Sequence, residues 1–136
     1  MSNSKSIGIA YSDQNIDGAD TLLSDGTLGY TAAAQGSVTQ LTSKSTAVTL
    51  NKSAGQITMN GASLGATTNV TFTLNNNLIS ANDIVILNIA AGATAGSYNC
   101  WVSGVSAGSV SITVRNISGG PLLEAVVINF AIIHCI

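Results

Sequence analysis

The chain has 136 residues, of which 46% are hydrophobic and only 7% are charged, and its formal net charge is −2. An ordinary soluble domain has roughly 25% charged residues, so this surface has to be built from Ser, Thr, Asn, Gly and Ala. The few basic residues are scattered and cannot neutralise many phosphates, which argues against nucleic acid as a partner. No basic amphipathic helix indicates a membrane surface. Because little charge keeps copies of the chain apart, the composition favours a protein of an ordered assembly, with a secreted all-β domain as the alternative.

Residues 1–27 are predicted to form an extended N-terminal arm. Their apolar residues are scattered among Ser, Asp and Asn, and no period of 2 or 3.6 holds for long. Such a segment buries little against itself, so it either floats or lies on a partner, and its Ile and Leu side chains favour a partner. The side chains expected to contact that partner are Ile7, Ile9, Tyr11, Ile16, Leu22 and Leu23.

One short motif in the arm begins like a calcium-binding loop. Residues 13–20 place acidic or amide oxygens at the first, third and fifth positions and a glycine at the sixth. The match then fails, because Ser24 stands where a bidentate Glu is needed and no helices flank the loop. We therefore interpret the segment as an Asx-rich turn and expect no metal.

From Leu28 onward the sequence alternates apolar and polar residues in short runs, as β-strands do. The expected strands cover residues 37–42, 47–51, 56–59, 70–74, 84–89, 98–102, 109–115 and 125–136. Ser106-Ala107-Gly108 predicts a hairpin turn, whereas residues 61–66 or 82–83 could hold a short turn of helix. The spacing predicts an all-β fold, a jelly-roll-like β-sandwich of about eight strands spanning residues 28–136.

The last stretch, residues 125–136, is the one around which the rest of the fold is organised. It is apolar on both faces except at Asn129 and His134, so we expect a central strand covered on both sides by a second sheet and another subunit. Residues 84–89 form a second run that is apolar on both faces. Trp101, Phe130 and His134 are predicted to lie in the core or at a subunit interface.

No group of residues predicts catalysis. His134 is the only histidine, and its neighbour Cys135 should point to the opposite face of the strand. The acids Asp83 and Glu124 stand at strand starts, where carboxylates commonly bond turn amides. Because nucleophile, base and oxyanion donor are not found together, we expect no catalytic residues, no cofactor and no enzymatic activity.

The two ends of the chain are informative about the cellular compartment of the protein. The first seven residues lack the apolar core of a signal peptide. The C-terminal apolar run is shorter than the roughly 20 residues that a membrane helix needs. We therefore expect a protein made and kept in a cytoplasm, with Cys100 and Cys135 as reduced, buried thiols. On count alone a disulfide between them stays open.

Several segments resemble a module that is common in virion proteins of tailed bacteriophages. They are residues 29–32, 36–40, 42–52, 55–59, 102–103, 111–116 and 124–131. The most specific are the run Thr-Ser-Lys-Ser-Thr at residues 42–46 and the run Ile-Asn-Phe-Ala at residues 128–131. Related sequences look like capsid decoration (cement) proteins and C-terminal parts of larger phage structural proteins, and residues 7–17 are similar to openings of phage particle proteins. The resemblance implies a trimeric β-sandwich of jelly-roll type without enzymatic activity.

The resulting hypothesis is a capsid decoration protein, made in the cytoplasm of a bacterial host and located on the outer capsid surface of the virion. A homotrimer would bind the major capsid protein and stabilise the shell by multivalent contact. The alternative is a tail-fibre, spike or head-fibre domain that binds a host receptor, for which Trp101, Tyr30 and Tyr98 are the available aromatic side chains. A secreted adhesion or lectin-like domain is disfavoured by the missing signal peptide.

Overall fold

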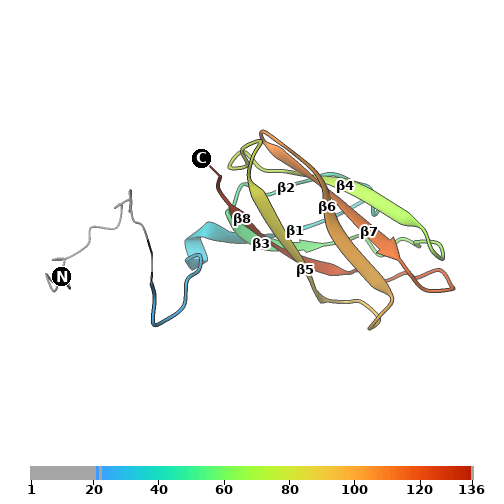
Figure 1. Ribbon diagram of the computed structural model, residues 1–136. Coiled ribbons are helices and arrows are strands. Elements are labelled where there is room, and N and C mark those ends of the chain that lie inside the picture. Colours follow the sequence, from blue (N-terminus) through green and yellow to red (C-terminus); the bar gives the residue numbers. More distant parts are fainter. Residues whose placement is uncertain (1–20, 22, 136) are drawn as a thin grey trace, which may run out of the picture.

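Two packed β-sheets make up the fold in the computed structural model, which describes residue 21 and residues 23–135 (Figure 1). The elements are the 3-10 turn η1 (Ala32–Ala34) and the strands β1 (Gln35–Thr39), β2 (Val48–Thr49), β3 (Ala54–Thr58), β4 (Asn69–Asn75), β5 (Ile84–Ala91), β6 (Tyr98–Ser106), β7 (Ser109–Asn116) and β8 (Val127–Ile133). Each expected strand overlaps one of these, so the all-β sandwich of eight strands that the alternation predicts is confirmed.

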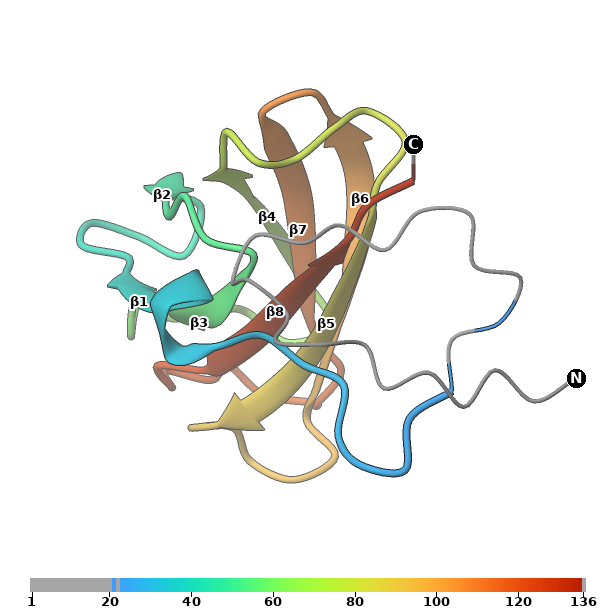
Figure 2. The same ribbon diagram turned by 90° about the vertical axis from the view of Figure 1, so that its left-hand side faces the viewer.

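The strands divide equally between two sheets (Figure 2). Sheet A has the order β1-β3-β8-β5 and sheet B the order β2-β4-β7-β6. Both sheets are mixed, because β1 pairs with β3 and β2 with β4 in parallel while the other pairs are antiparallel. The predicted hairpin is confirmed: β6 and β7 pair up to Ser106 and Ser109, with the turn at Ala107-Gly108.

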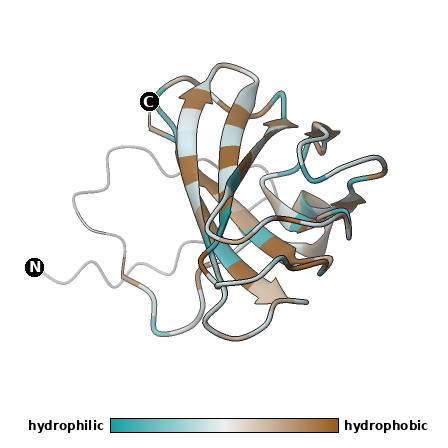
Figure 3. Ribbon diagram, turned by 90° about the vertical axis from the view of Figure 1, so that its right-hand side faces the viewer, coloured by the Kyte–Doolittle hydropathy of each residue, from teal (hydrophilic) through white to brown (hydrophobic). Residues whose placement is uncertain are grey.

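The core lies between the sheets and consists mainly of aliphatic side chains. Ile57, Phe72, Ile112 and Ile128 are among its largest fully buried side chains. Along most strands every second residue faces this core, which gives the banding of apolar and polar positions in Figure 3. Phe130, predicted to lie in the core or at an interface, is buried in this core.

The sequence predicts cover on both faces for β8 and apolar character on both faces for β5, and the described chain buries only one face of each. β8 lies centrally in sheet A between β3 and β5, yet its outward Ile133 is 48% exposed. β5 is an edge strand, and its outward Ile84 and Ile86 are 55% and 51% exposed. The physical reason is that a two-layer sandwich gives each sheet one inner face, so apolar runs do not by themselves reveal a third layer. Cover by another subunit stays a prediction.

The short helical turn expected at residues 61–66 or 82–83 is absent there, and that prediction is wrong. Leu64 instead forms an antiparallel bridge with Leu122, which holds the first segment extended. Asp83 closes a turn in which its amide donates to the carbonyl of Ser80 at 3.2 Å. The one short helix in the described part of the chain is η1, which comes directly before β1.

Lys44, in the Thr-Ser-Lys-Ser-Thr run, is buried and joins loops that are distant in sequence. Its ammonium group donates to the carbonyls of Asn60 and Glu124 at 2.7 and 2.6 Å. Burial lowers the pKa of Lys44, and the Glu124 carboxylate opposes this effect. Gln40 supports the same junction, because its side chain donates to the carbonyl of Thr46 at 2.8 Å. The run is therefore a structural element of the loop between β1 and β2.

Two glycines with positive φ provide a matched pair of mutations. Gly92, after β5, has φ +70°, and a Cβ there would lie 2.4 Å from the carbonyl oxygen of Ala125. Gly108, in the hairpin turn, has φ +81° and open space around it. The left-handed conformation alone costs an L residue about 1–2 kcal/mol. We expect Gly108→Ala to lower the free energy of unfolding by that amount and Gly92→Ala by more, since the backbone must also move. Urea unfolding measures both, and equal losses would contradict the close contact at Gly92.

Candidate assembly surface

Half of the outer face of sheet A is apolar. Alternation turns Ile84 and Ile86 of β5 and Ala131 and Ile133 of β8 outward, and cross-strand pairing places Ile84 beside Ile133 and Ile86 beside Ala131. The three isoleucines are each about half exposed. β5 ends the strand order, so its far edge has no strand partner among the described residues. Contiguous apolar surface on a sheet, next to an open strand edge, is typical of a contact with another protein.

The chain that leads into η1 crosses this apolar half, as Figure 2 shows. The Tyr30 hydroxyl donates to the carbonyl of Ile132 in β8, which fixes the segment against the sheet. Leu28 and Tyr30 together with Ile86, Ala131 and Ile133 line a hollow of about 530 Å³. We call Leu28, Tyr30, Ile84, Ile86, Ala131 and Ile133 the assembly surface.

His134 and Asp83 lie at the rim of this surface. The side chain of His134 is 50% exposed and its Nδ1 lies 2.8 Å from Oδ2 of the buried Asp83 carboxylate. The same carboxylate accepts the amide of Ser80 at 2.8 Å and the amide of Cys135 at 3.1 Å. Asp83 therefore bonds turn amides, as its position before a strand predicts. His134 lies after the end of β8 rather than inside the strand, which corrects the predicted position.

The hydrogen bonds to Asp83 lead to an acid-dependence of stability. The Ser80 amide chiefly, and also the Cys135 amide and His134, hold the pKa of the Asp83 carboxyl below its ordinary value of 3.8. A carboxyl whose pKa is lower in the folded state stabilises the fold above its unfolded pKa, and this contribution is lost as the pH falls through the folded pKa. We expect the thermal midpoint to fall below about pH 4 and Asp83→Asn to weaken this dependence. An unchanged acid dependence in the variant would contradict this role.

Glu124, the other acid noted at a strand start, belongs to a structural cluster. Thr94 donates its hydroxyl to the Glu124 carboxylate, which lowers the pKa of that carboxyl. Burial and then the neighbouring Glu124 carboxylate raise the pKa of Tyr98 to about 12. The Tyr98 hydroxyl and Glu124 Oε2 are buried without a hydrogen bond of normal geometry to any described residue. A phenol with such a raised pKa stays neutral at physiological pH.

Only some of the remaining predicted contact residues lie in the part of the chain that the structure describes. Ile7, Ile9, Tyr11, Ile16 and Leu22 lie outside the described residues, as does the calcium-like loop of residues 13–20. Leu23 is almost fully exposed. Trp101 is 36% exposed on the outer face of sheet B, so it is not a core residue, and its place at a subunit interface stays a prediction.

The two cysteines differ from the predicted pair of buried thiols. Cys100 is half-buried against the core, and burial raises the pKa of its thiol. Cys135 is exposed, because β8 ends at Ile133 and the chain leaves the sheet before it. The prediction of burial is therefore wrong for Cys135. Both are free thiols in the structure.

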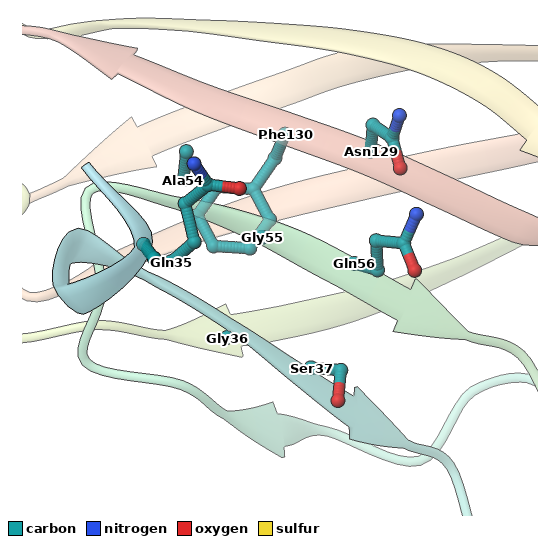
Figure 4. Close-up of a pocket in the computed structure, with 9 residues that line it drawn as sticks. Gln35, Gly36, Ser37, Ala54, Gly55, Gln56, Asn129 and Phe130 are labelled. Atoms are coloured by element: carbon teal, nitrogen blue, oxygen red, sulfur yellow. The ribbon is translucent and has the colours of Figure 1, made fainter. Parts of the chain in front are cut away.

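A second hollow on the outer face of sheet A lies over β1, β3 and β8 (Figure 4). It has a volume of about 520 Å³ and is lined by polar amides and small residues rather than by isoleucines. In Figure 4 the side chains of Gln56 and Asn129 project side by side from β3 and β8. The sequence signals Asn129 only as an interruption of an apolar strand, and nothing in it indicates that Gln56 lies beside it.

Among the described residues, no three His, Cys, Asp or Glu side chains lie close enough together to hold a metal ion. The same part of the chain has no helix with the length and apolar character needed to cross a membrane. Comparisons of the chain with protein-family models, with curated proteins and with solved structures gave no match in any of the three.

Proposed function

We propose that this protein is a capsid decoration protein of a tailed bacteriophage, which binds the major capsid protein on the outer capsid surface as a homotrimer and stabilises the shell. The single observation that supports this most is the assembly surface, an apolar sheet face on a chain with only 7% charged residues. Ile84, Ile86 and Ile133 make no contribution to the core between the sheets. Their burial against neighbouring chains would stabilise an assembly by the hydrophobic effect.

The proposal also draws on the resemblance of residues 29–136 to phage virion modules. In that arrangement the trimer holds several capsid subunits at once, so each weak contact acts at a high effective concentration. The protein binds only the assembled lattice and therefore shifts the equilibrium of the shell toward the intact state.

The direct test mixes the purified protein with shells assembled from the major capsid protein alone. We expect the protein to cosediment with the shells at a saturable ratio and to raise their melting temperature in scanning calorimetry. The variant Ile86→Lys serves as the matched surface control and should do neither. Shells that melt at the same temperature with and without saturating protein would contradict the proposal.

The arm allows a further prediction about how the shell is contacted. Deleting residues 1–27 should leave a folded trimer that no longer decorates shells, because the scattered apolar side chains of this segment gain burial only on a partner. Cosedimentation and solution mass measure the two properties separately. A chain in which residues 1–27 are replaced by a Gly-Ser segment of equal length is the control for length. Full decoration by the truncated chain would reject this role for the arm.

A receptor-binding domain of a tail fibre, spike or head fibre is the second candidate, and exposed Trp101 is the observation that favours it. The tryptophan lies on a face whose cross-strand neighbours are polar, with Thr113 directly beside it and Arg115 next to Asn99. An indole on such a face can stack on a sugar or receptor group. Binding to host cells that is lost in Trp101→Ala would favour this candidate over the first.

A further inference from the structure

The outer face of sheet A carries a transverse row of polar side chains next to the assembly surface. Ser37, Gln56, Asn129 and Asn88 are consecutive cross-strand partners on β1, β3, β8 and β5. Neighbouring strands lie about 4.8 Å apart, so hydrogen-bonding groups recur at that spacing across the whole sheet. The row separates the aliphatic half of the face from its remainder.

Part of this row lies in the groove of about 520 Å³ that Figure 4 shows. The groove extends over β1, β3 and β8, and η1 bounds it at one end through Ala32. Its lining residues are Ala32, Gln35, Gly36, Ser37, Ala54, Gly55, Gln56, Asn129 and Phe130. Small-molecule sites typically occupy roughly 300–1,000 Å³ and combine apolar walls with a few convergent polar groups. The groove has both properties.

One atom in the groove lacks a partner. Oδ1 of Asn129 is buried and makes no hydrogen bond to any described residue. Buried polar atoms in native proteins are generally paired, so Asn129, which lines the groove, has hydrogen-bonding capacity that the described fold does not use. Gln35 contributes a second acceptor, because its Nε2 donates to the carbonyl of Tyr30 at 2.9 Å and its Oε1 is left for a ligand.

The lining also restricts the chemistry of the ligand. None of the described residues that line the groove is charged, which disfavours phosphates, carboxylates and cations. Side-chain amides and hydroxyls both donate and accept, which matches the hydroxyl groups of a sugar. The lining reaches the edge strand β1, but the amides of Gln56 and Asn129 lie on the inner strands β3 and β8, where a bound peptide could not continue the backbone ladder. We infer that the groove binds a neutral saccharide, whose adjacent hydroxyls bond the amides of Gln56 and Asn129.

The test uses the full-length protein labelled with ¹⁵N and the probes glucose, galactose, N-acetylglucosamine and maltose. We expect at least one probe to shift the side-chain amide signals of Gln56 and Asn129 saturably in the NMR spectrum. Gln56→Ala and Asn129→Ala should each weaken that binding by about tenfold, the effect of one well-formed hydrogen bond to a sugar. Asn88→Ala is the matched control, because Asn88 belongs to the same row but does not line the groove, and it should bind as the wild type does.

Two features keep the test decisive. Gln56 is exposed, so Gln56→Ala should leave the fold intact, and Asn129→Ala should not lower the thermal midpoint because Oδ1 of Asn129 has no hydrogen bond to lose. The inference is overturned if none of the four sugars shifts these signals, if glucose 6-phosphate binds better than glucose, or if Trp101→Ala abolishes binding while Gln56→Ala does not. None of these measurements involves a capsid, so a negative result leaves the proposed decoration function untouched. Failure of the protein to bind capsid shells would likewise leave the saccharide inference untouched.

Discussion

The substitution Ile86→Lys should convert the assembled protein into a folded monomer. Ile86 is half exposed on β5 at the centre of the assembly surface and does not belong to the core, so the sandwich itself should tolerate the change. In an assembly the lysine would be buried against apolar side chains without an acidic partner, which costs about 3–5 kcal/mol for each such contact. That loss corresponds to a weakening of association by more than about a hundredfold.

Light scattering after gel filtration gives the mass, and circular dichroism shows whether the β-sheet signal is retained. The matched control is Asn75→Lys, which adds the same charge to an exposed position on a strand of sheet B. This control should keep the mass of the wild type. If Ile86→Lys keeps that mass as well, the outer face of sheet A is not the surface through which the copies associate.

A second large effect is expected inside the fold, at Asn116. Its side chain is fully buried and its Nδ2 donates to the carbonyls of Leu64, Gly65 and Gly120 at 2.9, 3.0 and 2.8 Å. Its Oδ1 accepts the amide of Ser118 at 2.9 Å. Asn116→Ala removes all of these bonds at once from a fully buried position, so we expect the free energy of unfolding to fall by about 2–4 kcal/mol.

Urea unfolding measures this loss, and Asn77→Ala is the control. Asn77 is exposed, and substitutions of that kind usually change stability by less than about 0.5 kcal/mol. Asn116→Asp should destabilise the fold as well, although it keeps the size of the side chain, because a carboxylate cannot donate to the three carbonyls. A loss in Asn116→Ala as small as that in Asn77→Ala would show that these hydrogen bonds do not tie the loops together.

The strands of this protein could be predicted from its sequence because alternation is a local property. Segments such as residues 70–74 and 109–115 carry the period of two clearly, and the turn at Ala107-Gly108 has its own local signal. The expected cap at Asp83 is likewise a short-range effect, since the accepted amide of Ser80 is only three residues away.

Properties that depend on distant parts of the chain could not be predicted in this way. The run at residues 84–89 is apolar on both faces, and its sequence does not distinguish a central strand from an edge strand whose outer face is apolar and exposed. Lys44 and Asn116 would both be assigned to the surface by residue type, and only the loops that they join explain their burial. The amide pair of Gln56 and Asn129 depends on the register between β3 and β8, which no local pattern gives.

In the assembly that we propose, neighbouring chains cover the outer face of sheet A. The decisive measurement is amide hydrogen exchange of the segment Ile84–Ala91, followed by mass spectrometry at high and at low protein concentration. We expect slow exchange in the concentrated, assembled protein and faster exchange on dilution, because the far edge of β5 has no strand partner among the described residues of one chain. Fast exchange of this segment at both concentrations, with the core strand β7 protected throughout, would contradict it.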